Sequence, residues 1–191
     1  LDAHVRDQLV RKRLHNQSYS QDIFLDPESI PLLQSSLERL KKLQALVGYA
    51  NFSLLDFDLA VKTARAYPRV GAFTKAELNF LETLFYAQGQ QYGFMGEKPI
   101  TAITGTIQRK SVQKIPFTGN YLYRGRPVER YERIKKEIGN QVILTSGVRS
   151  VIKQFLLFLN KAAASNANLS MASRSLAPPG YSFHGVGDFD V

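Results

Sequence analysis

The sequence changes character near residue 92, and this change constrains the fold more than any other feature. Before it, leucines recur at the three- and four-residue spacing of amphipathic helices. After it, glycine, proline and β-branched residues dominate the stretch 99–125, which is typical of loops and short strands. We therefore predict an α+β protein, in which a mostly helical N-terminal region, residues 1–92, precedes a small domain with an antiparallel sheet, residues 93–191.

Helix-start signals divide the N-terminal region. Asp26 can cap a helix, and Pro27 suits a first helical position. The hydroxyl of Thr74 and the carboxylate of Glu77, three residues later, have the spacing of a capping box. The expected helices are residues 26–48, residues 54–66 and one that begins after residue 74.

The second region is expected to mix short helices and strands. The expected elements are short strands within 99–125, a basic helix at 130–138, an apolar strand at 142–145, an amphipathic helix at 150–165 and a polar loop at 166–181. A Pro179-Gly180 turn near the end of that loop leads the chain into its last ten residues.

The composition excludes several classes of protein. There is no cysteine, so disulfides and cysteine-based zinc or redox chemistry are excluded. We expect no transmembrane segment, because no apolar run approaches the roughly 18 residues that span a bilayer. The net charge of +9 attracts polyanions, but the basic residues are scattered. We therefore do not expect nucleic-acid binding, since no basic tract or recognition motif is present.

The last ten residues combine one histidine with two carboxylates. Their sequence is Ser182-Phe183-His184-Gly185-Val186-Gly187-Asp188-Phe189-Asp190-Val191. Imidazole nitrogen and carboxylate oxygen are both zinc ligands, but a catalytic zinc usually takes three protein ligands and a water. In an extended chain, Asp188 and Asp190 share one face and Phe189 points the opposite way, towards a core.

Three fragments occur in a fixed order in this part of the chain. They are Ser146-Gly147-Val148-Arg149-Ser150, then Gln154, then Ser182-x-His184-x-x-Gly187 after the Pro-Gly turn. In this combination, residues 140–191 resemble the zinc D-alanyl-D-alanine carboxypeptidases, the VanY-like peptidoglycan peptidases, which are related in fold to the Hedgehog signalling domain. The resemblance implies that the second region is a small antiparallel-sheet zinc peptidase domain.

The resemblance also implies that His184 and an aspartate hold Zn²⁺. The family aspartate falls seven residues after the histidine, where this chain has Val191. A one-residue deletion after Gly187 aligns Asp190 with the family aspartate, so Asp190 is the expected ligand. Asp188 is then a neighbour that orients the imidazole, or the alternative ligand.

Three further residues gain roles from the resemblance. Arg149 would take the terminal carboxylate of a peptide, since a guanidinium matches a carboxylate through two hydrogen bonds. Gln154 would hydrogen-bond the substrate, and Ser182 would bind substrate or brace the site beside the metal. Each also has a structural interpretation: a surface arginine paired with an acid, a polar residue on the exposed face of a helix, and a turn hydroxyl.

The family's third zinc ligand, a histidine, and its general base, a glutamate three residues before it, have no counterpart in this sequence. We therefore expect the peptidase-like domain to be incomplete at its C-terminal end. The implied function is hydrolysis of D-Ala-D-Ala or a related bond in peptidoglycan stem peptides, in the periplasm, in the cell envelope or after secretion. The alternative is a non-catalytic peptidoglycan- or protein-binding module on the same scaffold. Oligomeric state, D,D or L,D bond, and carboxypeptidase or endopeptidase stay open.

Overall fold

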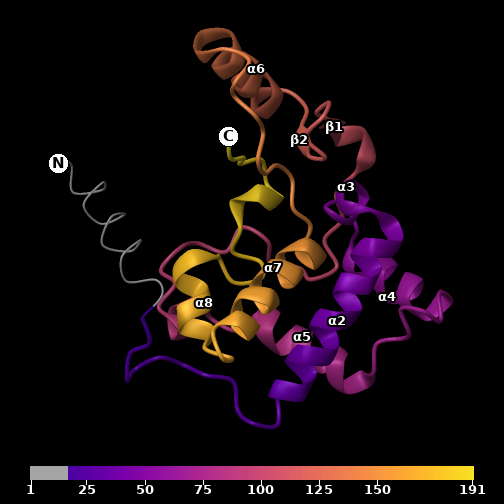
Figure 1. Cartoon of the computed structure of the whole chain (residues 1–191), viewed down its shortest axis with the longest axis vertical. Helices are drawn as coiled ribbons and strands as arrows, with labels where there is room; N and C mark the ends of the chain where they lie inside the picture. Colours follow the sequence, from indigo (N-terminus) through magenta and orange to yellow (C-terminus); the bar gives the residue numbers. More distant parts are fainter. Residues whose placement is uncertain (1–16) are drawn as a thin grey trace.

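The computed structural model describes residues 17–191 and combines helices with one small antiparallel sheet (Figure 1). The α-helices are α2 (Ile30–Val47), α3 (Tyr49–Phe52), α4 (Phe57–Ala66), α5 (Lys75–Tyr86), α6 (Arg126–Ile138), α7 (Val151–Ala164) and α8 (Leu169–Ser175). The strands β1 (Val112–Lys114) and β2 (Tyr121–Tyr123) pair antiparallel, and short 3-10 helices are η1 (Gly89–Tyr92), η2 (Arg109–Ser111) and η3 (Phe183–Gly185). The predicted mixture of helices and a small antiparallel sheet is confirmed.

One hydrophobic core joins helices from both predicted regions. Helix α7 packs against α2 and α8, and α2 also packs against α5. Leu40, Leu43, Phe85, Phe155 and Phe158, from α2, α5 and α7, are completely buried in this core. The change of sequence character near residue 92 therefore does not mark a gap in the packing. Helix α6 projects away from the core beside the two strands (Figure 1).

The capping box predicted at the start of α5 is confirmed and also holds a buried ion pair. The Thr74 hydroxyl accepts from the Glu77 backbone N–H, and the Glu77 carboxylate accepts from the Thr74 backbone N–H. The other carboxylate oxygen of Glu77 lies 3.1 Å from the guanidinium of Arg39 on α2. Arg39 also donates to the carbonyl oxygens of Val70 and Gly71, so it ties α2 to α5 and to the preceding loop.

Two helix starts differ from the prediction. The Asp26 carboxylate accepts from the backbone N–H and the hydroxyl of Ser29, and it closes a turn ahead of α2. Pro31 then occupies the first turn of α2. The helix predicted over 54–66 begins later, because the Asp56 side chain accepts from the Leu59 N–H and caps α4 there.

The strand predicted at 142–145 is wrong. This segment forms no ladder; at its end, the amide of Asn120 donates to the carbonyl oxygens of Leu144 and Thr145. Regular pairing is limited to one isolated antiparallel bridge between Ser146 and Asp190.

The polar loop predicted at 166–181 is wrong in part, because it contains α8. The Asn168 side chain accepts from the Met171 N–H and caps this helix. Helix α6 also begins earlier than predicted, where Gly125 adopts a φ of 79° and Pro127 follows in the first turn. Between residues 17 and 191, no helix has the length and apolar character needed to cross a membrane.

Candidate metal centre

The C-terminal segment is fastened beside the Ser-Gly-x-Arg-Ser loop by backbone hydrogen bonds. The Asp190 N–H donates to the Ser146 carbonyl oxygen at 2.8 Å, and the Thr145 N–H donates to the Asp190 carbonyl oxygen at 3.0 Å. Phe189 packs edge-to-face on Tyr131 of α6, with ring centroids 6.1 Å apart. The side chain between the two aspartates thus points into a small apolar cluster, as an extended chain would place it.

His184 lies between a backbone carbonyl and a carboxylate. Its Nδ1 is 3.0 Å from the carbonyl oxygen of Gly147, and its Nε2 is 3.3 Å from Oδ2 of Asp190. A carbonyl oxygen only accepts, so Nδ1 carries a proton when this hydrogen bond forms. Burial, followed by the charge of Arg149, lowers the pKa of His184. A neutral imidazole therefore presents the bare lone pair of Nε2 on the side of Asp190.

The two aspartates are placed differently. Asp190 contacts both His184 and Arg149 through Oδ2, although its side chain is 58% exposed. Asp188 is exposed, and its charge is the smallest of the factors that act on the pKa of His184, raising it. The expected ligand is thus the aspartate that lies beside the histidine.

The His184–Asp190 pair fits one edge of a zinc site. Nitrogen and oxygen donors at about 2.0–2.2 Å from a tetrahedral zinc lie about 3.3–3.6 Å from each other. The separation of Nε2 and Oδ2, 3.3 Å, is at the lower end of this range, and a hydrogen bond such as that from Nδ1 to Gly147 commonly orients a metal-binding histidine. Within residues 17–191, no cluster of three histidine, aspartate or glutamate side chains could hold a metal ion. The described residues thus offer two side chains with the spacing of zinc ligands and no third.

Arg149 is held beside this pair by Ser146. Its Nε and Nη2 donate to the Ser146 hydroxyl at 3.0 and 2.7 Å, and Nη2 lies 3.5 Å from Oδ2 of Asp190. The side chain is only 15% exposed, and burial lowers the pKa of Arg149 against the opposing charge of Asp190. In the described part of the chain, Nη1 donates no hydrogen bond to the protein, so this arm of the guanidinium can bind an anion.

Gln154 and Ser182 lie deeper than the sequence suggested. Gln154 is 2% exposed; its Nε2 donates to the carbonyl oxygen of Ala177, and its Oε1 is buried without a partner. The interpretation of Gln154 as a residue on an exposed helix face is therefore wrong, and substrate binding by Gln154 stays a prediction. Ser182 is also buried, at the start of η3 and two residues before His184. Its predicted contact with substrate or metal likewise stays a prediction.

Tyr123 and Gly147 help to position the site, although the sequence assigned no function to either residue. The Tyr123 hydroxyl donates to the carbonyl oxygen of Gly185 at 2.8 Å and so fixes η3 against β2. At Gly147 any Cβ would collide with the backbone carbonyl of Tyr121, which accepts from the Val148 N–H. Gly147 stands in the recognised motif, but nothing local in the sequence links Tyr123 to η3.

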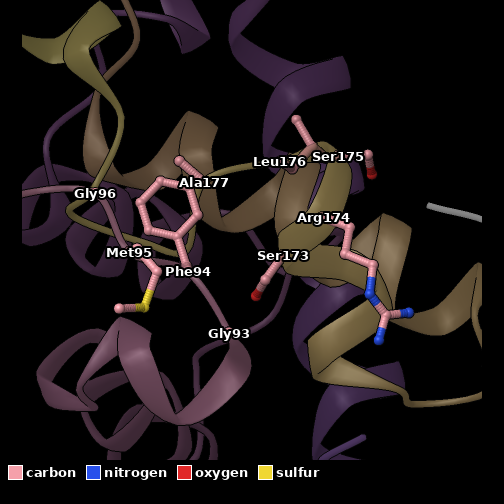
Figure 2. A pocket seen from close by; sticks show the side chains of 9 residues that line it. All are labelled: Gly93, Phe94, Met95, Gly96, Ser173, Arg174, Ser175, Leu176 and Ala177. Carbon is pink, nitrogen blue, oxygen red and sulfur yellow. The ribbon is translucent and has the colours of Figure 1, made fainter. Parts of the chain in front are cut away.

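Pockets surround Arg149, and a larger one lies elsewhere. Cavities of about 130 and 90 Å³ are both lined by Arg149. A pocket of about 560 Å³ lies between the loop after η1 and α8, where Phe94 and Met95 stand across from Ser173 and Arg174 (Figure 2). None of the predicted site residues lines this larger pocket, so volume alone does not locate the site.

Comparison of the chain with protein-family models, curated proteins and solved structures finds no match. The likeness to VanY-like peptidases therefore depends on the quoted residues and on their arrangement.

Proposed function

We propose that this chain belongs to a zinc-dependent peptidase of the VanY-like kind, acting on D-Ala-D-Ala or a related bond in peptidoglycan stem peptides. One observation carries the proposal: His184 and Arg149, 35 residues apart in the sequence, both lie within 3.5 Å of the same carboxylate oxygen of Asp190. A peptidoglycan substrate also implies a periplasmic, cell-envelope or secreted location.

His184 and Asp190 are the proposed zinc ligands, and the hydrogen bond of His184 to Gly147 determines which ring nitrogen is available. His184 can bind zinc through Nε2, because its Nδ1–H donates a hydrogen bond to the carbonyl oxygen of Gly147. Asp190 can bind zinc through Oδ2. When bound, zinc supplies Lewis-acid activation of water and of the scissile amide. Asp188, exposed and nearby in sequence, adds negative charge without a direct contact.

Arg149 is proposed to read the free carboxylate of the peptide. Nε and Nη2 of Arg149 donate to the Ser146 hydroxyl, so Nη1 is the nitrogen left to bind the peptide. Binding a terminal carboxylate at this arm would place the end of the peptide beside the His184–Asp190 pair. The scissile bond then lies near the metal side, as a carboxypeptidase requires.

One observation favours the alternative, a non-catalytic binding module on the same scaffold. Among the residues that the structure describes, no third metal ligand or glutamate base accompanies His184 and Asp190. A binding module would still use Arg149 to recognise a carboxylate, but it would turn over no peptide.

Zinc analysis together with mass spectrometry of a pentapeptide ending in D-Ala-D-Ala tests the proposal, with the protein as its gene encodes it. Released D-alanine with bound zinc supports the peptidase; peptide binding without release supports the module. Arg149→Ala should lower turnover at least 100-fold while zinc stays bound, and exposed Arg124→Ala is the control. An unaffected rate for Arg149→Ala, or no zinc and no D-alanine, contradicts the proposal.

A further inference from the structure

A small pocket beside the first turn of α7 brings together two cations. It measures about 130 Å³, and its walls include Tyr49, Asn120, Ser146, Arg149 and Lys153. Its lining contains no aspartate or glutamate, and neither His184 nor Asp190 belongs to it. The pocket is therefore electropositive, and neither of the two expected zinc ligands is part of its wall.

Lys153 is buried in this pocket without a counter-charge. The residue is 5% exposed, and its Nζ lies 4.0 Å from the centroid of the Tyr49 ring. No carboxylate of residues 17–191 forms an ion pair with it. Burial, with the charge of Arg149 as a second cause, lowers the pKa of Lys153 to about 8. A buried ammonium group that lacks an anion is costly, so the site favours a negative partner.

The helix adds positive potential to the same place. Lys153 lies in the first turn of α7, where the Ser150 side chain accepts from its backbone N–H. Backbone dipoles make this end of a helix positive, which disfavours cations and favours anions. Arg149 precedes the cap, so two side-chain cations lie at the helix end that suits them least.

We propose that this pocket binds a small oxyanion, a carboxylate or phosphate group, between Lys153 and Arg149. At roughly 30 Å³ for each water molecule, the pocket has the volume of about four waters, which is enough for a carboxylate or a phosphate group. The Ser146 hydroxyl accepts from Arg149, so its own proton is free to donate to the anion. The proposal does not depend on zinc, because the two expected zinc ligands lie outside the pocket.

The test uses metal-free full-length protein titrated with sodium acetate or with sodium phosphate at constant ionic strength. Backbone amide NMR shifts in the segment 146–154 should saturate with at least one of the two anions. Lys153→Met removes the charge but keeps an apolar side chain against Tyr49, and it should weaken binding at least tenfold. Lys161→Met, with the same charge change on the last turn of α7, should alter affinity less than twofold.

A second measurement keeps the test independent of the variant's folding. In the unaltered protein, saturating anion should raise the pKa of Lys153, because a bound anion favours the ammonium form. A larger response to acetate identifies a carboxylate site, and a larger response to phosphate identifies a phosphate site. Shifts that never saturate, equal losses in both variants or an unchanged pKa of Lys153 overturn the proposal.

Discussion

The Nδ1–H of His184 donates to the carbonyl oxygen of Gly147 across 3.0 Å, which leaves Nε2 without a proton in the neutral ring. Nε2 then faces Oδ2 of Asp190 at 3.3 Å, so two electron-pair donors lie side by side. Such a pair repels unless a proton or a cation lies between its members. Burial and the charge of Arg149 lower the pKa of His184, and the gap between Nε2 and Oδ2 is where the proposed zinc would lie.

Zinc affinity should depend on both side chains, and more strongly on His184 than on Asp190. His184→Ala should abolish stoichiometric zinc binding, because it removes the only imidazole near Asp190 among the described residues. Asp190→Asn should weaken zinc binding about 10–100-fold, since a neutral amide replaces a charged ligand. Isothermal titration with Zn²⁺ measures both effects.

Asp188→Asn is the matched control for Asp190→Asn, because both remove one negative charge from the same short segment. Its effect on zinc affinity should stay well below that of Asp190→Asn. A larger loss in Asp188→Asn would reverse the assignment of the ligand.

Gly147→Ala should damage both the fold and the site. The new methyl group would collide with the backbone carbonyl of Tyr121, which cannot swing aside as a side chain can. We expect a loss of about 2 kcal/mol or more in the free energy of unfolding, together with weaker zinc binding, because the carbonyl that orients His184 moves. Urea unfolding and zinc titration measure the two effects. Thr145→Ala, an exposed change two residues away, should alter neither; a stable Gly147→Ala protein would contradict the packing described.

Arg39→Met should strongly destabilise the helical core. The Glu77 carboxylate is 2% exposed and would lose its cationic partner, which typically costs about 3–5 kcal/mol. Lys42→Met is the control, because it breaks an exposed pair with Glu38 on the same helix and should change stability little. Thermal and urea unfolding of the two variants should differ clearly, and equal midpoints would refute a structural role for the buried pair.

Stability should rise between pH 8 and 10.5 through Lys153. In the unfolded chain this lysine keeps its proton up to about pH 10.5, whereas burial, together with the charge of Arg149, lowers its pKa to about 8 in the folded state. Between these values the unfolded state binds more protons, so the free energy of unfolding increases with pH, by on the order of 3 kcal/mol.

Lys153→Met should lose this increase and should be the more stable protein below pH 8. Urea unfolding at several pH values from 7 to 10.5 measures the difference between the two proteins. Lys161→Met should retain the dependence on pH of the unaltered protein. Parallel curves for Lys153→Met and the unaltered protein would show that Lys153 is not buried as a cation.

Local signals were predictable from the sequence, and signals that depend on distant neighbours were not. The Thr74–Glu77 capping box forms as predicted because both partners lie within one helical turn. The segment 142–145 has the composition of a strand, but the amide of Asn120 takes two of its carbonyl oxygens. No pattern in the sequence predicts this contact, because Asn120 is 24 residues before Leu144.

In α7, too, burial that depends on local sequence was predictable, and burial that depends on distant residues was not. The apolar face of this helix was predictable from its period, but Lys153 and Gln154, on its other side, are buried as well. The Tyr49 ring packs against Lys153, and the side-chain amide of Gln154 donates to the carbonyl oxygen of Ala177. The motif brought out His184, Asp190 and Arg149 as candidates, while the second cation of the neighbouring pocket became visible only in three dimensions.

The bridge between Ser146 and Asp190 has a consequence for the order of folding. Helices α7 and α8 occupy the sequence between these residues, so the bridge closes a long loop whose entropy cost is recovered only after both helices have packed. The segment that carries His184 should therefore be the last part of the described chain to settle and the first to open by local unfolding. An ion held between His184 and Asp190 would bind only the closed form, and would slow the exchange of their backbone amide hydrogens with solvent.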